Sequence, residues 1–347
     1  MRPSDSVQRV GFLAAVPPIL RSLGINSDDV LRQVDLAPDA LTDPEATIAF
    51  AAMGRLVDVA ARQASCPHIG LLIGSQITTT SLGLIGELMR NAPTLGTAMR
   101  DLATHQHRHA RGAVAYLLNL PGQALFGYAI YQPGIAGAAQ ISDGAAAGTF
   151  NLIAELIGRK AMAGAEVVFA RTTPVDLEPY RRRFSGAKLR FDSEQSGTMM
   201  PRAWLERPVI GADPARRQLL ETQVESFWRA GDFDIVTQLR RALRVGLLTG
   251  QISRLQIAAR LGLTPRTFAR RLADHDAGFQ DLLDEARCEF AMQLLGETRI
   301  SASEISLILR YADPSIFSRA FLRWSTLTPR DWRAAHLANE ELSKAGA

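Results

Sequence analysis

Two related stretches decide the fold of the C-terminal third, Ile257–Leu272 (IAARLGLTPRTFARRL) and Ile305–Phe321 (ISLILRYADPSIFSRAF). In each, apolar residues recur at helical spacing on both sides of a short polar break, which predicts two helices joined by a tight turn. A capping side chain followed by proline opens the second helix in both stretches, as Thr264–Pro265 and Asp313–Pro314. We therefore predict two helix-turn-helix motifs, of which the second has a turn one residue longer.

Paired apolar residues set the core face of each predicted second helix. Phe268 and Leu272 lie four positions apart, as do Phe317 and Phe321, so each pair shares one face. Between the motifs, Phe279–Leu295 is predicted to be a long amphipathic helix that fixes their separation. A single motif is equally compatible with a purely structural helix pair, but two copies with matching caps favour a DNA-binding module.

The charge of the chain is concentrated in this region. Residues 234–336 hold 15 arginines, no lysine and 11 acidic residues, and their net charge of +4 equals that of all 347 residues. Strand-like segments cease at Gly231–Phe233, and about 100–200 residues per domain suggests two domains. We predict an N-terminal domain over residues 1–230 and a DNA-binding domain over residues 231–347. The preference for arginine over lysine has two readings, codon bias in a GC-rich genome and the suitability of arginine for bidentate contacts to guanine and phosphate.

The two motifs together resemble a known DNA-binding domain. Residues 257–287 (IAARLGLTPRTFARRLADHDAGFQDLLDEAR) and 300–333 (ISASEISLILRYADPSIFSRAFLRWSTLTPRDWR) are similar to the AraC/XylS family of bacterial transcription regulators. The resemblance covers roughly residues 235–336. It implies an all-α domain in which a rigid helix joins two helix-turn-helix units. Each unit would place a recognition helix in the major groove of double-stranded DNA.

The resemblance also assigns candidate DNA-contacting residues, which lie opposite the predicted core faces. In the first recognition helix they are Arg266, Ala269 and Arg270, with Thr267 and Arg271 at its sides, and in the second they are Pro314, Ser315, Ser318 and Arg319. The arginines are expected to bind a guanine edge or a phosphate, and the alternative is a solvated helix face. Two departures from the family pattern bear on the second unit. Arg310 and Ser325 stand at or near positions where the family usually has glycine, so Arg310 must adopt a positive φ or change the turn.

The N-terminal region predicts helices around a small sheet, a mixed α+β fold. A β-hairpin is predicted at Ala113–Leu120 and Ala124–Tyr131, because both runs are rich in β-branched, aromatic and leucine residues around Pro121–Gln123. Further elements are expected in the following stretches: helices at Ile48–Ala64, in two pieces over Leu82–Leu102, at Ala138–Ala161 and at Asp213–Trp228, and strands at Glu166–Ala170 and Lys188–Phe191.

This region resembles the non-cupin, arabinose-binding-type effector domain of the AraC/XylS branch related to ornithine-utilisation regulators. The similarity is carried by residues 43–74 (DPEATIAFAAMGRLVDVAARQASCPHIGLLIG), 81–103 (SLGLIGELMRNAPTLGTAMRDLA) and 175–214 (VDLEPYRRRFSGAKLRFDSEQSGTMMPRAWLERPVIGADP). It implies a domain that binds a small-molecule effector, forms a homodimer and has no catalytic residues.

We expect the effector pocket between the predicted hairpin and the Ala-rich helix. The candidate lining residues are Tyr116, Phe126, Tyr128, Tyr131 and Phe150, and for each the alternative is ordinary core packing. The Asp213–Trp228 helix (Leu219, Leu220, Val224 and Phe227) is a candidate dimer interface, and packing on its own domain is the alternative.

Metal binding and redox chemistry have weaker support. His105, His107 and His109 could chelate a metal only through the first and third, and no acidic or cysteine cluster joins them, so we expect a polar helix face and no metal or cofactor. Cys66 and Cys288 are far apart, form no disulfide framework and fit a reducing compartment. A lone cysteine such as Cys66 is expected to be structural.

These features together predict a transcriptional regulator, not an enzyme. The G-x-S-x-G, P-loop, H-E-x-x-H and dinucleotide-binding motifs do not occur in the sequence. No apolar stretch is long enough to span a membrane, and the N-terminal apolar segment Val10–Leu20 is interrupted by Pro17 and Pro18. We expect a cytoplasmic, nucleoid-associated bacterial protein, activating rather than repressing, that contacts RNA polymerase. A ligand-independent DNA-binding protein and an enzyme with an accessory DNA-binding module are the alternatives.

Overall fold

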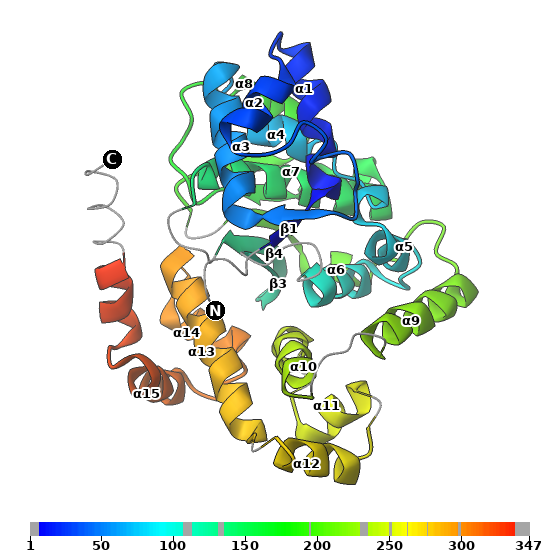
Figure 1. Cartoon of the computed structure of the whole chain (residues 1–347), viewed down its shortest axis with the longest axis vertical. Coiled ribbons are helices and arrows are strands. Elements are labelled where there is room, and N and C mark those ends of the chain that lie inside the picture. The colour runs from blue at the N-terminus through cyan, green and yellow to red at the C-terminus, as the bar shows by residue number, and fades with distance from the viewer. Residues whose placement is uncertain are drawn as a thin grey trace. The chain divides into compact units, whose positions relative to one another are not determined.

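A computed structural model shows two compact units, residues 1–220 and 221–347 (Figure 1). The structure describes residues 7–106, 113–130, 135–193, 196–229, 235–249, 252–261, 263–275, 277–297 and 300–336. The first unit mixes helices with two small sheets and the second is helical, which confirms the predicted fold class. The expected boundary at Gly231–Phe233 lies outside the described residues.

The first half of the N-terminal unit is mainly helical. Its elements are β1 (Val7–Arg9), the 3-10 helix η2 (Val10–Ala15), α1 (Val16–Ser22), α2 (Ser27–Gln33), β2 (Thr47–Ala49), α3 (Phe50–Gln63), α4 (Ile69–Gly74), η3 (Thr80–Leu82), α5 (Leu84–Arg90) and α6 (Leu95–His105). β1 and β2 form a two-stranded antiparallel sheet. The predicted break around Asn91–Pro93 is confirmed, because α5 ends at Arg90 and α6 begins only at Leu95 behind the Thr94 cap.

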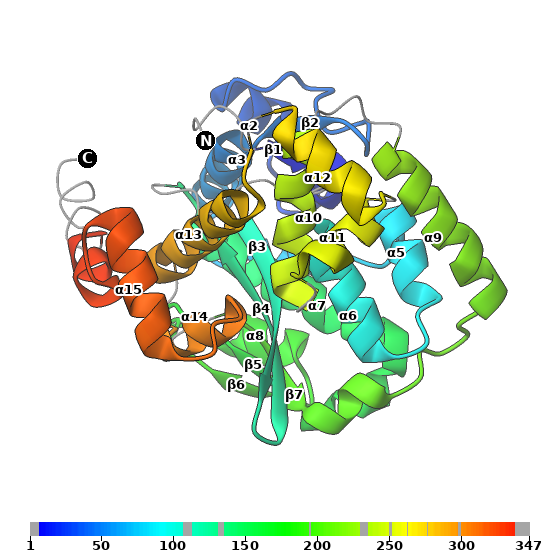
Figure 2. The same cartoon turned by 90° about the horizontal axis from the view of Figure 1, so that it is seen from below.

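A five-stranded sheet forms the second half of this unit, in the order β3-β4-β7-β5-β6 (Figure 2). The strands are β3 (Ala113–Leu120), β4 (Gln123–Ile130), β5 (Glu166–Val168), β6 (Lys188–Arg190) and β7 (Gly197–Pro201). All neighbouring pairs are antiparallel except β5 and β6. The predicted hairpin is confirmed, with Gly122 at φ 73° in its turn. The remaining elements are α7 (Ala138–Ile157), η5 (Arg159–Gly164), α8 (Glu178–Arg183) and η6 (Arg202–Glu206), followed by α9 (Pro214–Arg229), within which the first unit ends at Leu220.

Helix α7 packs against β4, β7 and β5, and also against α4. The contact with α4 is unusually close because glycines face one another: a Cβ atom on Gly74 would lie 2.1 Å from the Gly144 carbonyl oxygen. On another side of α7, Phe150 packs edge-on against Phe184 at 5.2 Å between ring centroids. The α7 helix is thus held by backbone contact on one side and by aromatic packing on another.

A buried polar cluster also anchors α7. Tyr180 donates a hydrogen bond of 2.5 Å to Asp143 Oδ2, and Arg171 donates to the same oxygen at 2.7 Å. The Asp143 side chain is fully buried, and its Oδ1 atom has no hydrogen-bond partner within the described residues. Burial raises the pKa of Asp143 above its ordinary value, although the bonds from Tyr180 and Arg171 act in the opposite direction.

The C-terminal unit consists of helices joined by short turns. They are α10 (Ile235–Thr249), α11 (Arg254–Arg260), α12 (Pro265–Ala273), α13 (Phe279–Glu297), α14 (Ala302–Ile308) and α15 (Pro314–Ser325), and residues 329–336 are also helical. The helix pairs α11–α12 and α14–α15 confirm the two predicted motifs, and α13 confirms the predicted connecting helix.

Two expectations about the N-terminal unit need correction. The sequence did not predict β7, which joins β4 to β5 at the centre of the sheet. His105 does not lie on a polar helix face, because α6 packs on β3 and buries it; His107 and His109 are outside the described residues. The part of the chain that the structure describes contains no group of three potential metal ligands.

Candidate DNA-binding surface and effector pocket

The recognition helices begin at the predicted caps. In α12, Thr264 Oγ1 accepts a hydrogen bond of 3.2 Å from the Thr267 backbone N–H, and Pro265 occupies the first helical position. In α15, Asp313 Oδ1 accepts a bond of 2.7 Å from the Ser315 N–H, behind Pro314. Because these bonds satisfy N–H groups that have no partner within the helix, both starts are fixed locally. Hydrogen bonds from Ser315 hold the pKa of Asp313 below its ordinary value.

The preceding helices carry a signal that the sequence reasoning missed. Ser253 and Gln256 at the start of α11, and Ser301 and Glu304 at the start of α14, form complete capping boxes. In each box the serine hydroxyl accepts a hydrogen bond from the backbone N–H three residues on, and the side-chain oxygen of Gln256 or Glu304 accepts one from the serine backbone N–H. The spacing S-x-x-E/Q was therefore a readable mark of both helix starts.

The turn of the second motif follows the expectation for its non-glycine residue. Arg310 adopts φ 61°, and its Nε atom donates a hydrogen bond of 3.3 Å to the Leu247 carbonyl oxygen. Near Ser325, the left-handed conformation falls on the next residue, Thr326, at φ 63°. The second motif therefore has two left-handed residues that are not glycine, and this conformation costs a residue with a Cβ atom about 1–2 kcal/mol.

Burial separates the two faces of each recognition helix. The core residues Phe268, Leu272, Phe317 and Phe321 are buried, as predicted. The candidate contact residues Arg266, Ala269, Arg270, Arg271, Pro314, Ser315 and Arg319 are exposed, whereas Thr267 and Ser318 are half-buried. Ser318 donates to the Pro314 carbonyl at 3.0 Å, and Thr267 contacts the Thr264 hydroxyl at 2.9 Å, so both side chains are partly occupied within their own helix start.

The arginines of this unit fall into two classes. Several are structural: Arg240 pairs with Glu285 at 2.7 Å, and Arg287 lies over the Tyr311 ring at 4.4 Å. By contrast, the candidate arginines of the recognition helices, Arg266, Arg270, Arg271 and Arg319, form no hydrogen bond or ion pair with any described residue. Their guanidinium groups are free to bind an external anion or a base edge.

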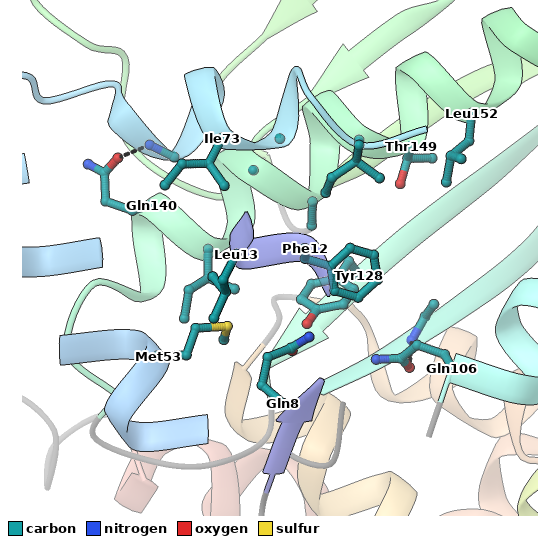
Figure 3. A pocket seen from close by; sticks show the side chains of 18 of the residues that line it. Gln8, Phe12, Leu13, Met53, Ile73, Gln106, Tyr128, Gln140, Thr149 and Leu152 are labelled. Atoms are coloured by element: carbon teal, nitrogen blue, oxygen red, sulfur yellow. Dashed lines mark hydrogen bonds between the residues drawn. The ribbon is translucent and has the colours of Figure 1, made fainter. Parts of the chain in front are cut away.

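The N-terminal unit contains a pocket with a cavity volume of about 130 Å³ (Figure 3). Its wall is built from β1, η2, α3, α4, α6, the β3–β4 hairpin and α7. Most of the lining is aliphatic or aromatic, with Gln8, Gln106, Gln140, Tyr128 and Thr149 as its polar side chains. The pocket thus lies where the hairpin meets the Ala-rich helix.

The predicted lining residues divide between this pocket and the core. Phe126 and Tyr128 line the pocket, from β4. Tyr116 and Phe150 do not: Tyr116 packs across the hairpin on Gly127, where a Cβ atom would lie 2.3 Å from its ring, and Phe150 joins the aromatic packing beside α8. Tyr131 lies outside the described residues.

The sequence did not predict that glycines of α4 and α7 form part of the pocket wall. Gly70 and Gly74 on α4, and Gly144 and Gly148 on α7, all line it. Glycine pairs four residues apart on two helices were the available signal, because such spacing puts both glycines on one face and permits close helix packing. The other cavity-facing polar residues, such as Thr149, have no local signature.

Three further expectations concern the α9 helix, Cys66 and membrane-spanning segments. Within α9, Leu220 and Val224 are buried, whereas Leu219 is 60% exposed. Cys66 is buried, and burial raises the pKa of its thiol, which disfavours the reactive thiolate. No helix among the described residues is both long and apolar enough to cross a lipid bilayer.

Known proteins match both units of the chain. Residues 24–209 match the family described as the arabinose-binding domain of AraC transcription regulator, N-terminal, and residues 257–335 match a helix-turn-helix domain family. The chain is 27% identical to the HTH-type transcriptional regulator VirS of Mycobacterium tuberculosis, over 95% of this chain and 97% of VirS. It is also 27% identical to the ornithine utilization regulator of Pseudomonas aeruginosa, over 94% and 96% of the two chains.

A solved structure, the transcriptional regulator CdpR from Pseudomonas aeruginosa, aligns with a TM-score of 0.45 at 20% identity, over 91% of this chain and 98% of CdpR. The family assignment rests on the sequence matches. The N-terminal match spans more than half of the chain, and the two capped helix-turn-helix motifs fall inside the second match. The chain therefore belongs to the AraC family of transcription regulators, as a DNA-binding helix-turn-helix protein with an arabinose-binding-type N-terminal domain.

Proposed function

We propose that this regulator is a cytoplasmic, homodimeric activator that binds operator DNA through α12 and α15 and responds to a small molecule held in its N-terminal unit. The observation that carries the DNA-binding part is the set of exposed arginines on the two recognition helices that form no ion pair with any described residue. Arg266, Arg270 and Arg319 would bind guanine edges or phosphates. Contact with RNA polymerase would follow from activation at a promoter.

The pocket supports a ligand-responsive protein over a ligand-independent one. A cavity of about 130 Å³ inside a domain is unusual for a purely structural unit, since cores are packed with few voids larger than a water molecule. A ligand that prefers one arrangement of the protein would shift the population toward it and change the affinity for DNA. The exposed Leu219 on α9 supports this helix as part of the dimer contact.

The DNA contacts are tested with the full chain and its Arg270→Ala variant. After selection of operator sites from random DNA, affinity is measured at several salt concentrations. If Arg270 binds a guanine, the variant loses about 5- to 150-fold in operator affinity and relaxes specificity at one base pair. If Arg270 binds a phosphate, the affinity for all DNA sequences falls by a similar factor, and the slope of log affinity against log salt concentration decreases in magnitude by about one.

A matched control separates these effects from general loss of positive charge. Arg21 is an exposed arginine in the N-terminal unit, and Arg21→Ala is expected to leave both affinity and salt slope unchanged. Operator affinity and salt slope that do not change in Arg270→Ala would contradict the proposed role of α12.

A further inference from the structure

The wall of the N-terminal pocket carries no charge. None of its described lining residues is Asp, Glu, Lys, Arg or His. One ionisable cluster, Asp143 with Arg171 and Tyr180, begins at a position of α7 that does not line the pocket, although its neighbour Gly144 does. Arg171 and Tyr180 both donate hydrogen bonds to Asp143 Oδ2, and none of the three residues lines the pocket.

Most of the polar groups in the wall are already used within the protein. Gln140 accepts from the Gly70 N–H and donates to the Pro67 carbonyl, both at 2.8 Å. Gln106 accepts from the Ala115 N–H at 2.8 Å and donates to the Ala113 carbonyl at 3.2 Å. Both ends of these two amides are therefore occupied by the backbone, and they offer a ligand little.

Of the glutamine and threonine side chains in the wall, two keep hydrogen-bonding capacity. The Thr149 hydroxyl forms no hydrogen bond within the described residues, and Gln8 uses only one end of its amide, donating to the Arg9 carbonyl at 2.9 Å. Thr149 and Gln8 are 8% and 2% exposed, so neither is satisfied by bulk solvent. Figure 3 shows the two side chains well separated on the wall, so one small polar group on a ligand reaches only one of them.

From these contacts we infer that the ligand of this pocket is an uncharged, largely apolar molecule about the size of a single aromatic ring, with at most one small hydrogen-bonding group. This inference rests on the proposed effector-binding function and specifies its ligand class. Burying a charged group without a partner is strongly unfavourable, and the wall supplies no partner. A zwitterion or a carboxylate would therefore be excluded, whereas a neutral ring loses nothing on entry.

The size follows from the cavity volume. The pocket measures about 130 Å³, close to an engineered apolar cavity of about 150 Å³ that holds benzene. Glycines help to create this space, since Gly70, Gly74, Gly144 and Gly148 line it without side chains. A ring with one substituent fills such a volume.

Three probes of similar shape test whether the pocket excludes charged ligands. Benzyl alcohol is neutral, benzoate carries a negative charge and benzylamine a positive one. Each is added at millimolar concentration to the full chain, and binding is followed by thermal shift and by calorimetry. We expect benzyl alcohol to raise the melting temperature, and the two charged probes to bind at least tenfold more weakly.

Two matched variants locate the binding site. Ala145 lines the pocket on α7, whereas Ala139 lies on the same helix but is exposed. Ala145→Leu is expected to abolish the response to benzyl alcohol, and Ala139→Leu is expected to keep it. Thr149→Val preserves the shape of the side chain and removes its hydroxyl. It should therefore weaken the binding of benzyl alcohol by about 2- to 10-fold, and leave unchanged the binding of toluene, which has no hydroxyl group.

The outcomes separate this inference from the proposed function. If benzoate or benzylamine binds as tightly as benzyl alcohol, and Ala145→Leu blocks that binding, the ligand class is wrong while the pocket remains an effector site. If no probe of any charge binds, or if binding survives Ala145→Leu, the inference fails together with the assignment of this pocket. Selective, Ala145-dependent binding of the neutral probes supports it.

Discussion

The contact between α4 and α7 makes a quantitative prediction for Gly74→Ala. The added methyl group would lie 2.1 Å from the Gly144 carbonyl oxygen and 2.6 Å from its Cα, whereas real Cβ contacts are essentially never below 3.0 Å. The two backbones must therefore move apart by about 0.9 Å, and neither is a flexible side chain that can turn away. Overpacking of this kind costs about 1–3 kcal/mol.

A gain in helix propensity offsets part of this cost, because alanine stabilises a helix by up to about 1 kcal/mol more than glycine does. Gly74 is the last residue of α4, so only part of that gain applies. The net expectation is that Gly74→Ala lowers the free energy of unfolding by about 1–2 kcal/mol. Because both helices line the pocket, the variant should also lose the response to benzyl alcohol.

The measurement is urea denaturation of the full chain, followed by circular dichroism. The matched control is Gly144→Ala on the facing helix, whose Cβ atom would meet the Gly70 carbonyl oxygen at 3.0 Å, a contact that a small shift relieves. We expect this control to stay within about 1 kcal/mol of the parent protein. A Gly74→Ala protein as stable as the parent, with unchanged ligand binding, would refute the close packing of α4 on α7.

Three further substitutions are predicted from local geometry. Burial places the pKa of Asp143 above its unfolded value of about 4, so the protonated carboxyl contributes stability that is fully present below pH 4 and is lost as pH rises through the folded pKa. Asp143→Asn removes this titration and should flatten this part of the curve of unfolding free energy against pH. Parallel curves for the two proteins would contradict the prediction. Thr264→Ala removes the α12 cap and should cost about 1 kcal/mol in urea denaturation, whereas Thr264→Ser should retain most of that stability. Thr326→Gly should stabilise the C-terminal unit by about 1 kcal/mol, because Thr326 has φ 63° and glycine adopts this conformation freely; a loss of stability would show that the threonine side chain compensates for the strain.

Features encoded by neighbouring residues could be predicted from the sequence. The starts of α12 and α15 follow from a capping side chain and a proline, and the hairpin follows from two β-rich runs around Pro121–Gln123. Each depends on interactions that span only a few residues. The positive φ of Arg310 is one of the two outcomes expected at a position where the family usually has glycine, the other being a changed turn.

Features that depend on contacts between residues far apart in the sequence could not be predicted from it. β7 contains Gly197 and Pro201 and lacks alternation, and it is a strand because β4 and β5 supply partners on both sides. The pocket wall is similar: Gln140 bonds to the Gly70 N–H, 70 residues away. Exposure of Arg270 and Arg319 agrees with their proposed contacts, but their binding to DNA stays a prediction that the operator measurements test.

The locally fixed starts of the recognition helices have a consequence for the evolution of this regulator. Thr264 and Asp313 secure each helix before its first exposed contact residue, and the phenylalanines behind secure its position on the domain. Exposed positions beyond the caps, such as Ala269 and Arg270, have no part in these local contacts. With the proposed DNA contacts, substitutions at these positions would change operator preference one residue at a time while the caps and the core face of each helix stay intact.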